Sequence, residues 1–448
     1  MNFNEALQRA SEVAIAHLGR IQEDIVLVRD LRGRIRLLLQ TPPHKIKSED
    51  RPDFKEGLEA LAKTISDDLS PIYAYSKSDL VLFRDNLSNL FPNDINLSFL
   101  GESDGYKALL HDRLLIGSEW DADLSEEETS PKRFTLYSMK GGVGRSTTVS
   151  ILAWHLASKG KRVLVVDLDL ESPGVGTTLL DENNRPLYGV VDWFVEDALG
   201  NGQAILADMV AESGLANTTQ GRIAVVPACG ADSYDYIAKL GRTYLERGSQ
   251  GPECWPDRLK RLLLDLEAQE APDFVLLDSR TGLHDTSAAL MLAVNAETFM
   301  FVADTRQTWA AYEVLFSHWK DQPEQIKRLR KRLWVLGSMI PRDDKEDDET
   351  SYSTGLRDRA WELFTNYLYD DEPESDEGGE DPNPPELFSF KSDDPYGHHF
   401  PRRILWDDAL RTFNPLASSN LDIVSVSYAS FLRWFDETYV DAVITEDP

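Results

Sequence analysis

Several strand-length runs of mainly apolar residues are separated by turns and helix-like segments. Residues 134–138, 161–166, 274–277 and 333–339 are such runs, and nearly continuous apolar character is typical of strands buried on both faces of a parallel sheet. A glycine-rich turn follows the first run, and the spacing over residues 146–158 then favours a helix. We therefore predict an α/β fold with a mostly parallel, doubly wound sheet and helices on both faces.

The first 120 residues have a different pattern. Residues 4–19, 58–69 and 76–90 carry apolar residues at helical spacing. Residues 24–30 and 34–39 look like two β-segments joined by a short glycine-containing turn. This pattern predicts a small N-terminal domain that is either α+β or mostly helical.

An acidic, polar stretch over residues 126–131 directly precedes the first buried strand. We therefore predict an N-terminal domain over residues 1–125 and a second domain over residues 132–445. Nothing in the N-terminal domain suggests catalysis, so it either docks a protein partner or reads DNA. Docking is favoured, because no convincing helix-turn-helix and no strong basic excess are present.

Two later segments are unlike the rest of the second domain. Residues 343–394 combine prolines with dense like charge, which predicts an irregular, mobile, acidic insertion. It is either a solubilising loop or a partner-binding or nucleotide-responsive lid. Residues 428–443 have apolar residues at helical spacing, but their polar positions are acidic, so a core helix is favoured over a membrane-binding one.

The segment from Met139 to Thr148 is the most informative polar stretch, because a glycine-rich turn between a strand and a helix is the context of a phosphate-binding loop. Its bare backbone lets N–H groups converge on phosphate oxygens, and the helix start adds a positive dipole end. Lys140 and Arg145 supply two cations. The predicted nucleotide-binding residues of this loop are Gly141, Gly142, Val143, Gly144, Arg145, Ser146 and Thr147. The alternative is a glycine-rich turn without a ligand.

Three aspartates follow two of the buried strands. Asp167 and Asp169 come at the end of residues 161–166, and Asp278 ends the run over 274–277. The carboxyl ends of parallel strands meet at one edge of a sheet, so these carboxylates should crowd the glycine loop. Mg²⁺ with a polyphosphate would offset their repulsion, since Mg²⁺ prefers hard oxygen ligands. Alternatively, each aspartate caps the turn that follows it.

Together these motifs resemble the ParA/MinD branch of P-loop ATPases, which carries a deviant Walker A loop, KGGxGK[ST]. The resemblance implies that Lys140 reaches across a dimer interface to the partner's phosphates. It further implies that Ser146 is a ligand of Mg²⁺ and that Asp278 holds the ion through water, with Asp167 beside them in the metal shell. Asp169 would orient the attacking water, and residues 279–285 would form switch II.

The resemblance extends over roughly residues 132–440. Residues 221–228 are similar to a mid-domain strand of the family, and residues 400–403 are similar to the segment that packs near adenine. It implies three further nucleotide contacts, at Met339, Pro401 and Arg402. The catalytic residues that it implies are Lys140, Arg145 and Asp169.

The chain departs from the family at three positions. Arg145 replaces the second P-loop lysine, giving KGGVGR. An arginine keeps the positive charge but is bulkier and less adaptable than a lysine. Phosphate binding should therefore survive, while ATP hydrolysis is less secure. Met139 occupies the place of the first Walker glycine. Arg280 is either an additional phosphate or interface cation or a surface salt-bridge residue.

Composition narrows the functional classes. The formal net charge is −30, which opposes non-specific binding to nucleic acid or anionic membranes. The two cysteines, Cys229 and Cys254, suggest neither a disulfide framework nor a metal knuckle, so a reducing cytoplasm fits. No apolar run approaches the length of a membrane span.

We therefore expect a cytoplasmic switch that binds ATP and Mg²⁺, hydrolyses ATP slowly, dimerises with nucleotide and thereby controls the docking of a protein partner. One alternative is a nearly non-hydrolysing nucleotide sensor in a bacterial defence or conflict system. Another is a DNA- or cargo-segregation ATPase.

Overall fold

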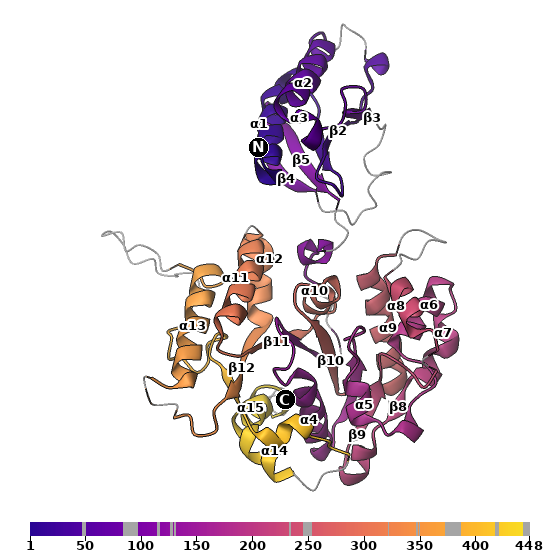
Figure 1. Ribbon diagram of the computed structural model, residues 1–448, viewed down its shortest axis with the longest axis vertical. Coiled ribbons are helices and arrows are strands. Elements are labelled where there is room, and N and C mark those ends of the chain that lie inside the picture. Colours follow the sequence, from indigo (N-terminus) through magenta and orange to yellow (C-terminus); the bar gives the residue numbers. More distant parts are fainter. Residues whose placement is uncertain are drawn as a thin grey trace, which may run out of the picture. The chain divides into compact units, whose positions relative to one another are not determined.

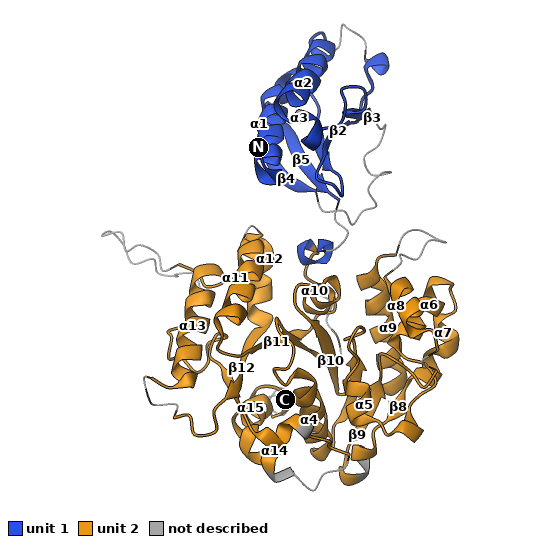
Figure 2. Cartoon of the chain, viewed as in Figure 1, with its two compact units in different colours: residues 1–121 blue, residues 122–448 orange. Residues whose placement is uncertain are grey.

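The computed structural model describes residues 1–46, 51–83, 97–113, 117–125, 129, 131–232, 234–244, 253–320, 322–345, 348, 350–371, 387–416 and 421–441. The chain forms two compact units, Met1–Asp121 and Ala122–Pro448 (Figure 2).

Unit 1 is an α+β unit. Its described strands form a five-stranded sheet in the order β3-β2-β1-β5-β4, in which β1 pairs antiparallel with β2 and parallel with β5. The strands are β1 (Ile25–Arg29), β2 (Ile35–Leu39), β3 (Val81–Phe83), β4 (Ser98–Ser103) and β5 (Tyr106–Asp112). The helices are α1 (Phe3–Ile21), α2 (Phe54–Asp68) and α3 (Ser70–Tyr73).

The core of unit 1 lies between the sheet and helices α1 and α2. Ala14 and Leu18 of α1 and Leu61 of α2 are fully buried in one cluster with Leu27 and Leu37 of the sheet. The predicted helices over 4–19 and 58–69 and the two predicted β-segments are confirmed. The helix predicted over 76–90 is wrong, because β3 begins at Val81; residues 84–90 lie outside the described residues.

Unit 2 contains an eight-stranded sheet, counted over its described residues, in the order β13-β12-β11-β6-β10-β7-β9-β8 (Figure 1). Its pairs are parallel except for β8 with β9. The strands are β6 (Lys132–Ser138), β7 (Arg162–Asp167), β8 (Ala211–Glu212), β9 (Arg222–Val226), β10 (Phe274–Thr281), β11 (Glu297–Val302), β12 (Leu333–Ile340) and β13 (Arg402–Leu405).

The helices of unit 2 cover both faces of this sheet (Figure 1). They are α4 (Arg145–Ser158), α5 (Val175–Leu179), α6 (Val190–Ala198), α7 (Gly202–Ile205), α8 (Tyr236–Thr243), α9 (Trp255–Glu270), α10 (Asp285–Leu292), α11 (Arg306–Lys320), α12 (Pro323–Leu329), α13 (Tyr352–Tyr367), α14 (Leu421–Ser427) and α15 (Ala429–Phe435). A single turn of π-helix, Asp436–Val440, continues α15.

The alternation of side chains along the strands creates two separate cores. In β7, Val163 and Val165 pack in a core with α4 and α15, while Leu164 and Val166 pack in a core with α6, α9 and α10. Successive strand residues point to opposite faces, so both faces need a helical layer. The predicted α/β fold with a mostly parallel, doubly wound sheet is therefore confirmed.

An aromatic cluster fixes the C-terminal helix to the middle of the sheet. Phe134 of β6 has its ring centroid 5.3 Å from Phe299 of β11, 5.0 Å from Phe435 of α15 and 4.8 Å from Tyr439. The core helix predicted within residues 428–443 is thus confirmed as far as Val440, and residue 441 is the last one described.

The segment expected to be an irregular insertion is partly ordered. Residues 352–367 form α13, whose Leu356, Ala360 and Phe364 are fully buried, so the prediction of an irregular segment over all of 343–394 is wrong. The apolar residues of α13 recur at helical spacing, which the acidic residues around them obscured. The most acidic part, residues 372–386, lies outside the described residues.

No helix in the described part of the chain is long and apolar enough to cross a membrane.

A buried ion pair joins the start of β6 to α9. The guanidinium of Arg133 donates to both carboxylate oxygens of Glu267, at 2.6 and 2.7 Å, and to the carbonyl of Val294 at 2.7 Å. Removing one partner of such a pair leaves an uncompensated buried charge.

We therefore expect Glu267→Gln to lower the free energy of unfolding by about 3–5 kcal/mol, as measured by urea denaturation with tryptophan fluorescence. Glu324→Gln is the control, because Glu324 pairs with Lys327 on the surface of α12, where such a pair contributes at most about 1 kcal/mol. Equal effects of the two substitutions would contradict the prediction.

Candidate functional site

The glycine loop leaves the carboxyl end of β6 and leads into α4. Gly142 and Gly144 have φ angles of +76° and +89°, a region that other residues rarely adopt, and Gly144 is the residue that precedes the helix. No heavy atom lies within 4 Å of a Cβ built on Gly141, Gly142 or Gly144, so open space borders the loop. Val143 and Thr147 are partly buried on either side of the helix start.

Arg145 is the first residue of α4, and its side chain is buried. Its Nε donates to Asp278 Oδ1 at 2.7 Å, and its Nη2 donates to Asp169 Oδ2, also at 2.7 Å. Its Nη1 donates to the hydroxyl of Ser138, the last residue of β6, at 3.0 Å. The guanidinium therefore lies among the strand-end carboxylates, and all three of its nitrogen atoms have partners.

Asp278 is held on both of its oxygens. Arg145 occupies Oδ1, and Ser146 Oγ donates to Oδ2 at 2.6 Å. Ser146 and Asp278 are thus in contact, as expected for two residues that share one site. Their roles as metal ligands stay a prediction.

Asp167 and Asp169 lie beside this pair. Asp167 Oδ2 accepts from the backbone N–H groups of Gly174 and Gly176, at 3.2 and 3.3 Å, and its Oδ1 accepts from the N–H of Asp169 at 3.3 Å. Asp169 receives, besides Arg145, the hydroxyl of Ser172 at 2.9 Å. The structure therefore brings the three predicted aspartates together at one edge of the sheet.

Burial and mutual repulsion act on the protonation of these acids. Burial, together with the nearby Asp278 carboxylate, raises the pKa of Asp167 to about 8. Burial also raises the pKa of Asp278, although Arg145 and Ser146 act in the opposite direction. The two carboxylates therefore disfavour each other's ionised form.

The two other predicted cations differ in their surroundings. Lys140 is exposed on the glycine loop, where its Nζ donates to the side-chain oxygen of Gln307 on α11. Arg280 forms an ion pair with Glu171, and the hydroxyl of Tyr244 donates to the same carboxylate at 2.7 Å. Arg280 thus links the segment after Asp278 to the segment after Asp169.

The predicted adenine-side residues lie on β12 and next to β13. Met339 is near the end of β12 and has a φ of +61°, and Pro401 directly precedes β13. Arg402 is buried over the ring of Trp434, with 4.5 Å between its Cζ and the ring centroid, and donates to the carbonyl of Pro395 at 2.7 Å. The nucleotide contacts of these three residues stay predictions.

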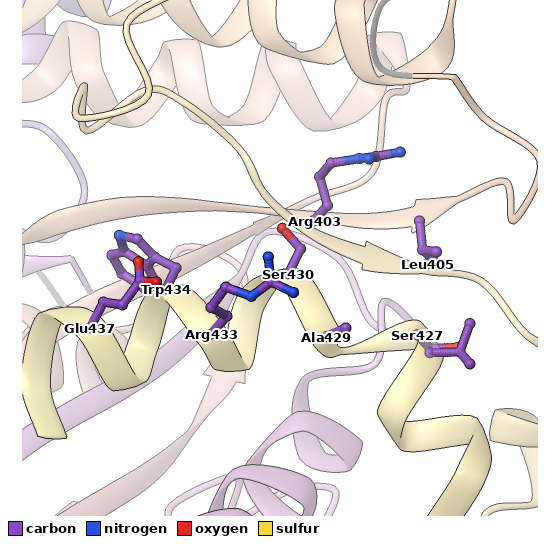
Figure 3. Close-up of a pocket in the computed structure, with 9 residues that line it drawn as sticks. Arg403, Leu405, Ser427, Ala429, Ser430, Arg433, Trp434 and Glu437 are labelled. Carbon is purple, nitrogen blue, oxygen red and sulfur yellow. The ribbon is translucent and has the colours of Figure 1, made fainter. Parts of the chain in front are cut away.

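A cavity of about 430 Å³ lies beside this segment, between β13 and helices α14 and α15 (Figure 3). Its lining residues are Arg403, Leu405, Val426, Ser427, Ala429, Ser430, Arg433, Trp434 and Glu437. None of the predicted nucleotide-binding residues is among them, so the cavity is separate from the glycine loop.

The donor set suits Mg²⁺ in type but not in arrangement. Ser146, Asp167 and Asp278 offer the hard oxygens that this ion prefers. Both oxygens of Asp278 already have partners, however, and no cluster of three or more histidine, cysteine, aspartate or glutamate side chains in the described residues is arranged to hold a metal. In this conformation the guanidinium of Arg145 bridges Asp169 and Asp278.

Sequence reasoning missed Ser138, Ser172 and Gln307, which hold Arg145, Asp169 and Lys140. Position offers a signal for the first two, since Ser138 ends the strand before the glycine loop and Ser172 follows Asp169 by three residues. Gln307 comes from a distant helix, and no local pattern indicates its contact.

Comparison with known proteins gives matches within unit 2. Residues 132–228 match a family model described as an AAA domain. The septum site-determining protein MinD of Helicobacter pylori is 42% identical over 74 residues, which cover 16% of this chain and 27% of MinD. The iron-sulfur cluster carrier protein of Escherichia coli K12 is 47% identical over 49 residues, which cover 11% of this chain and 13% of the carrier. A solved structure, the ParA family ATPase from Chlorobium tepidum TLS, is 14% identical with a TM-score of 0.41, over 68% of this chain and 98% of that chain.

These matches confirm the resemblance to ParA/MinD-like P-loop ATPases over the part of the chain that they cover. The chain spans about a quarter or less of the length of the two curated relatives. Those relatives also differ in function, so the matched segment does not select one activity.

The raised pKa of Asp167 predicts a pH-dependent stability. The folded protein keeps a proton on Asp167 that the unfolded chain, with a pKa near 3.8, has lost, so the free energy of unfolding should fall as pH rises from about 4 to about 8. The slope for one proton is at most about 1.4 kcal/mol per pH unit.

Asp167→Asn has no such proton to lose, so its free energy of unfolding, relative to that of the unsubstituted protein, should increase with pH. The measurement is a series of urea denaturations without nucleotide at pH 5 to 8, which spans most of the window of about 4 to 8. Asp181→Asn, at an exposed position, is the control and should run parallel to the unsubstituted protein. Parallel curves for Asp167→Asn as well would contradict the prediction.

Proposed function

We propose that the chain is a nucleotide-dependent switch that binds ATP at the loop over residues 139–147 and hydrolyses it slowly. The observation that carries the proposal is the open glycine loop at the start of α4, beside three buried aspartates at the strand ends. Several backbone N–H groups and the positive end of a 14-residue helix meet at this loop, which is a site for an anion.

The charge distribution favours a polyphosphate over a smaller anion. Lys140 is exposed at one end of the loop, and the hydroxyl of Ser146 lies at the other. The matched AAA-domain segment includes this loop together with Asp167 and Asp169. ATP is therefore the ligand that we propose, with contacts from the loop backbone, Lys140 and Thr147.

Slow turnover follows from the state of Asp169. Water-positioning in phosphoryl transfer needs a carboxylate that is free to accept a proton or orient a water molecule. Both oxygens of Asp169 accept hydrogen bonds here, from Arg145 and Ser172. We therefore propose a turnover well below the median enzymatic value of about 10 per second.

The same observation favours a second candidate, a nucleotide sensor that binds ATP and hardly cleaves it. In either case the output would be dimerisation and docking of a protein partner, through unit 1 or the acidic segment of unit 2. A role in DNA segregation is disfavoured by the net charge of −30. Whether the switch acts in a defence system would depend on which partner it docks.

The glycine loop can be tested with a matched pair of substitutions. Gly144 and Gly160 both have positive φ angles, +89° and +81°, and no heavy atom lies within 4 Å of a Cβ built on either. Alanine at either position therefore causes similar backbone strain, on the order of 1–2 kcal/mol. Gly144 lies in the loop, whereas Gly160 follows the other end of α4.

We expect Gly144→Ala to weaken ATP binding in calorimetry by about tenfold or more, equivalent to about 1.4 kcal/mol, because the backbone N–H groups no longer converge on the phosphates. Gly160→Ala should change the affinity by less than about twofold. Absence of ATP binding by the unsubstituted protein would refute the proposed function.

Lys140 provides a second test. We expect Lys140→Ala to bind ATP but to remain monomeric in light scattering with size-exclusion chromatography, because the family resemblance assigns this exposed loop lysine to the phosphates of a second subunit. Lys327→Ala, an exposed lysine of α12, should dimerise with ATP like the unsubstituted protein. Dimerisation of Lys140→Ala to the same extent would exclude the cross-subunit role.

A further inference from the structure

Arg145 lies between Asp169 and Asp278, two of the acids that surround the predicted metal site. It is the first residue of α4, and side chains at that position lean toward the helix N-terminus, here toward the ends of β6 and β10. Its side chain is 7% exposed, and its three bonds run to three different elements of unit 2: Ser138 of β6, Asp169 after β7 and Asp278 of β10.

The charge balance at this edge depends on that guanidinium. Asp167 is stabilised by backbone N–H groups, whereas Asp169 and Asp278 each receive a charged donor, which in both cases is Arg145. Buried carboxylates need either a proton or a cation nearby. Arg145 supplies one positive charge that both Asp169 and Asp278 share.

A lysine at position 145 could not make the same set of contacts. Lysine carries its donors on one nitrogen, whereas arginine presents five N–H donors in a planar fork. Three atoms of the fork reach three partners here at 2.7 to 3.0 Å. The KGGVGR sequence is therefore matched to the bridging of two carboxylates and not only to phosphate.

The loop itself does not depend on movement of this arginine. Space around Gly141, Gly142 and Gly144 is open while Arg145 is paired below them. The loop therefore has open space beside Gly141 and Gly142 while the arginine keeps its contacts. Those contacts use three of its five N–H donors.

We propose that Arg145 acts as a resident cation in place of the divalent metal, so that this chain binds the triphosphate of ATP without requiring Mg²⁺. This inference rests on the proposed ATP binding and concerns how that site meets its charge requirement. Of the two oxygens of Asp278, Oδ1 accepts from this resident cation and Oδ2 accepts from Ser146.

The test is calorimetry of ATP binding to the full chain, in excess Mg²⁺ and in EDTA, for the unsubstituted protein and for Arg145→Lys. We expect the affinity of the unsubstituted protein to differ by less than about threefold between the two conditions. Arg145→Lys releases one or both carboxylates, so its affinity should rise about tenfold or more when Mg²⁺ is present.

Electron paramagnetic resonance of Mn²⁺ gives a second measurement that does not depend on turnover. With ATP, Arg145→Lys should alter the Mn²⁺ spectrum beyond the change that ATP alone causes, and the unsubstituted protein should not. If Arg145→Lys folds poorly, the calorimetry of the unsubstituted protein in Mg²⁺ and in EDTA still decides the matter.

The possible results separate the two proposals. A requirement for Mg²⁺ of about tenfold or more in the unsubstituted protein would overturn the resident-cation inference and leave ATP binding intact. Failure to bind ATP in both Mg²⁺ and EDTA would overturn the proposed function, and the inference with it.

Discussion

The convergence of carboxylates at one edge of a parallel sheet is the constraint on which the site depends. Parallel strands β7 and β10 are paired in register, with Asp167 opposite Asp278, so their acids must be neighbours once the sheet forms. Burial then makes an uncompensated pair of charges costly. The contacts of Arg145, the backbone N–H groups on Asp167 and the raised pKa of Asp167 are three responses to this single electrostatic problem.

Most of unit 2 could be predicted from the sequence, because its strands are continuous apolar runs with little ambiguity. The runs that end at Ser138, Asp167 and Asp278 each became a parallel strand, and the acids came together because topology alone determines where strand ends meet. The strands of unit 1 were harder to predict. Strands β4 and β5 flank Asp104 and Gly105, a dipeptide typical of tight hairpins, but the residues of β4 are largely exposed and lack a clear alternation.

The side-chain arrangement of the site could be predicted less well than its location. A phosphate-loop cation is expected to point at the ligand, whereas Arg145 points at Asp169 and Asp278. No local pattern gives this orientation, because it depends on the distances between three strand ends and on a planar side chain that can bridge them. The interaction of Lys140 with Gln307 could not be predicted from a local pattern either, because it joins residues 167 positions apart.

The two loop cations divide functions that one flexible lysine would combine. An exposed lysine can exchange its partner, because the hydrogen bond to Gln307 competes with water and with any incoming phosphate. A buried arginine with three partners cannot exchange so readily, because each contact that it loses leaves a carboxylate or a hydroxyl unpaired in the protein interior. Under the proposed function, Lys140 on the surface of the loop would respond to the ligand, and Arg145 neutralises the buried carboxylates. Such a separation favours a site that registers the presence of nucleotide over one that consumes it rapidly, since the acid that would position water is part of the static arrangement.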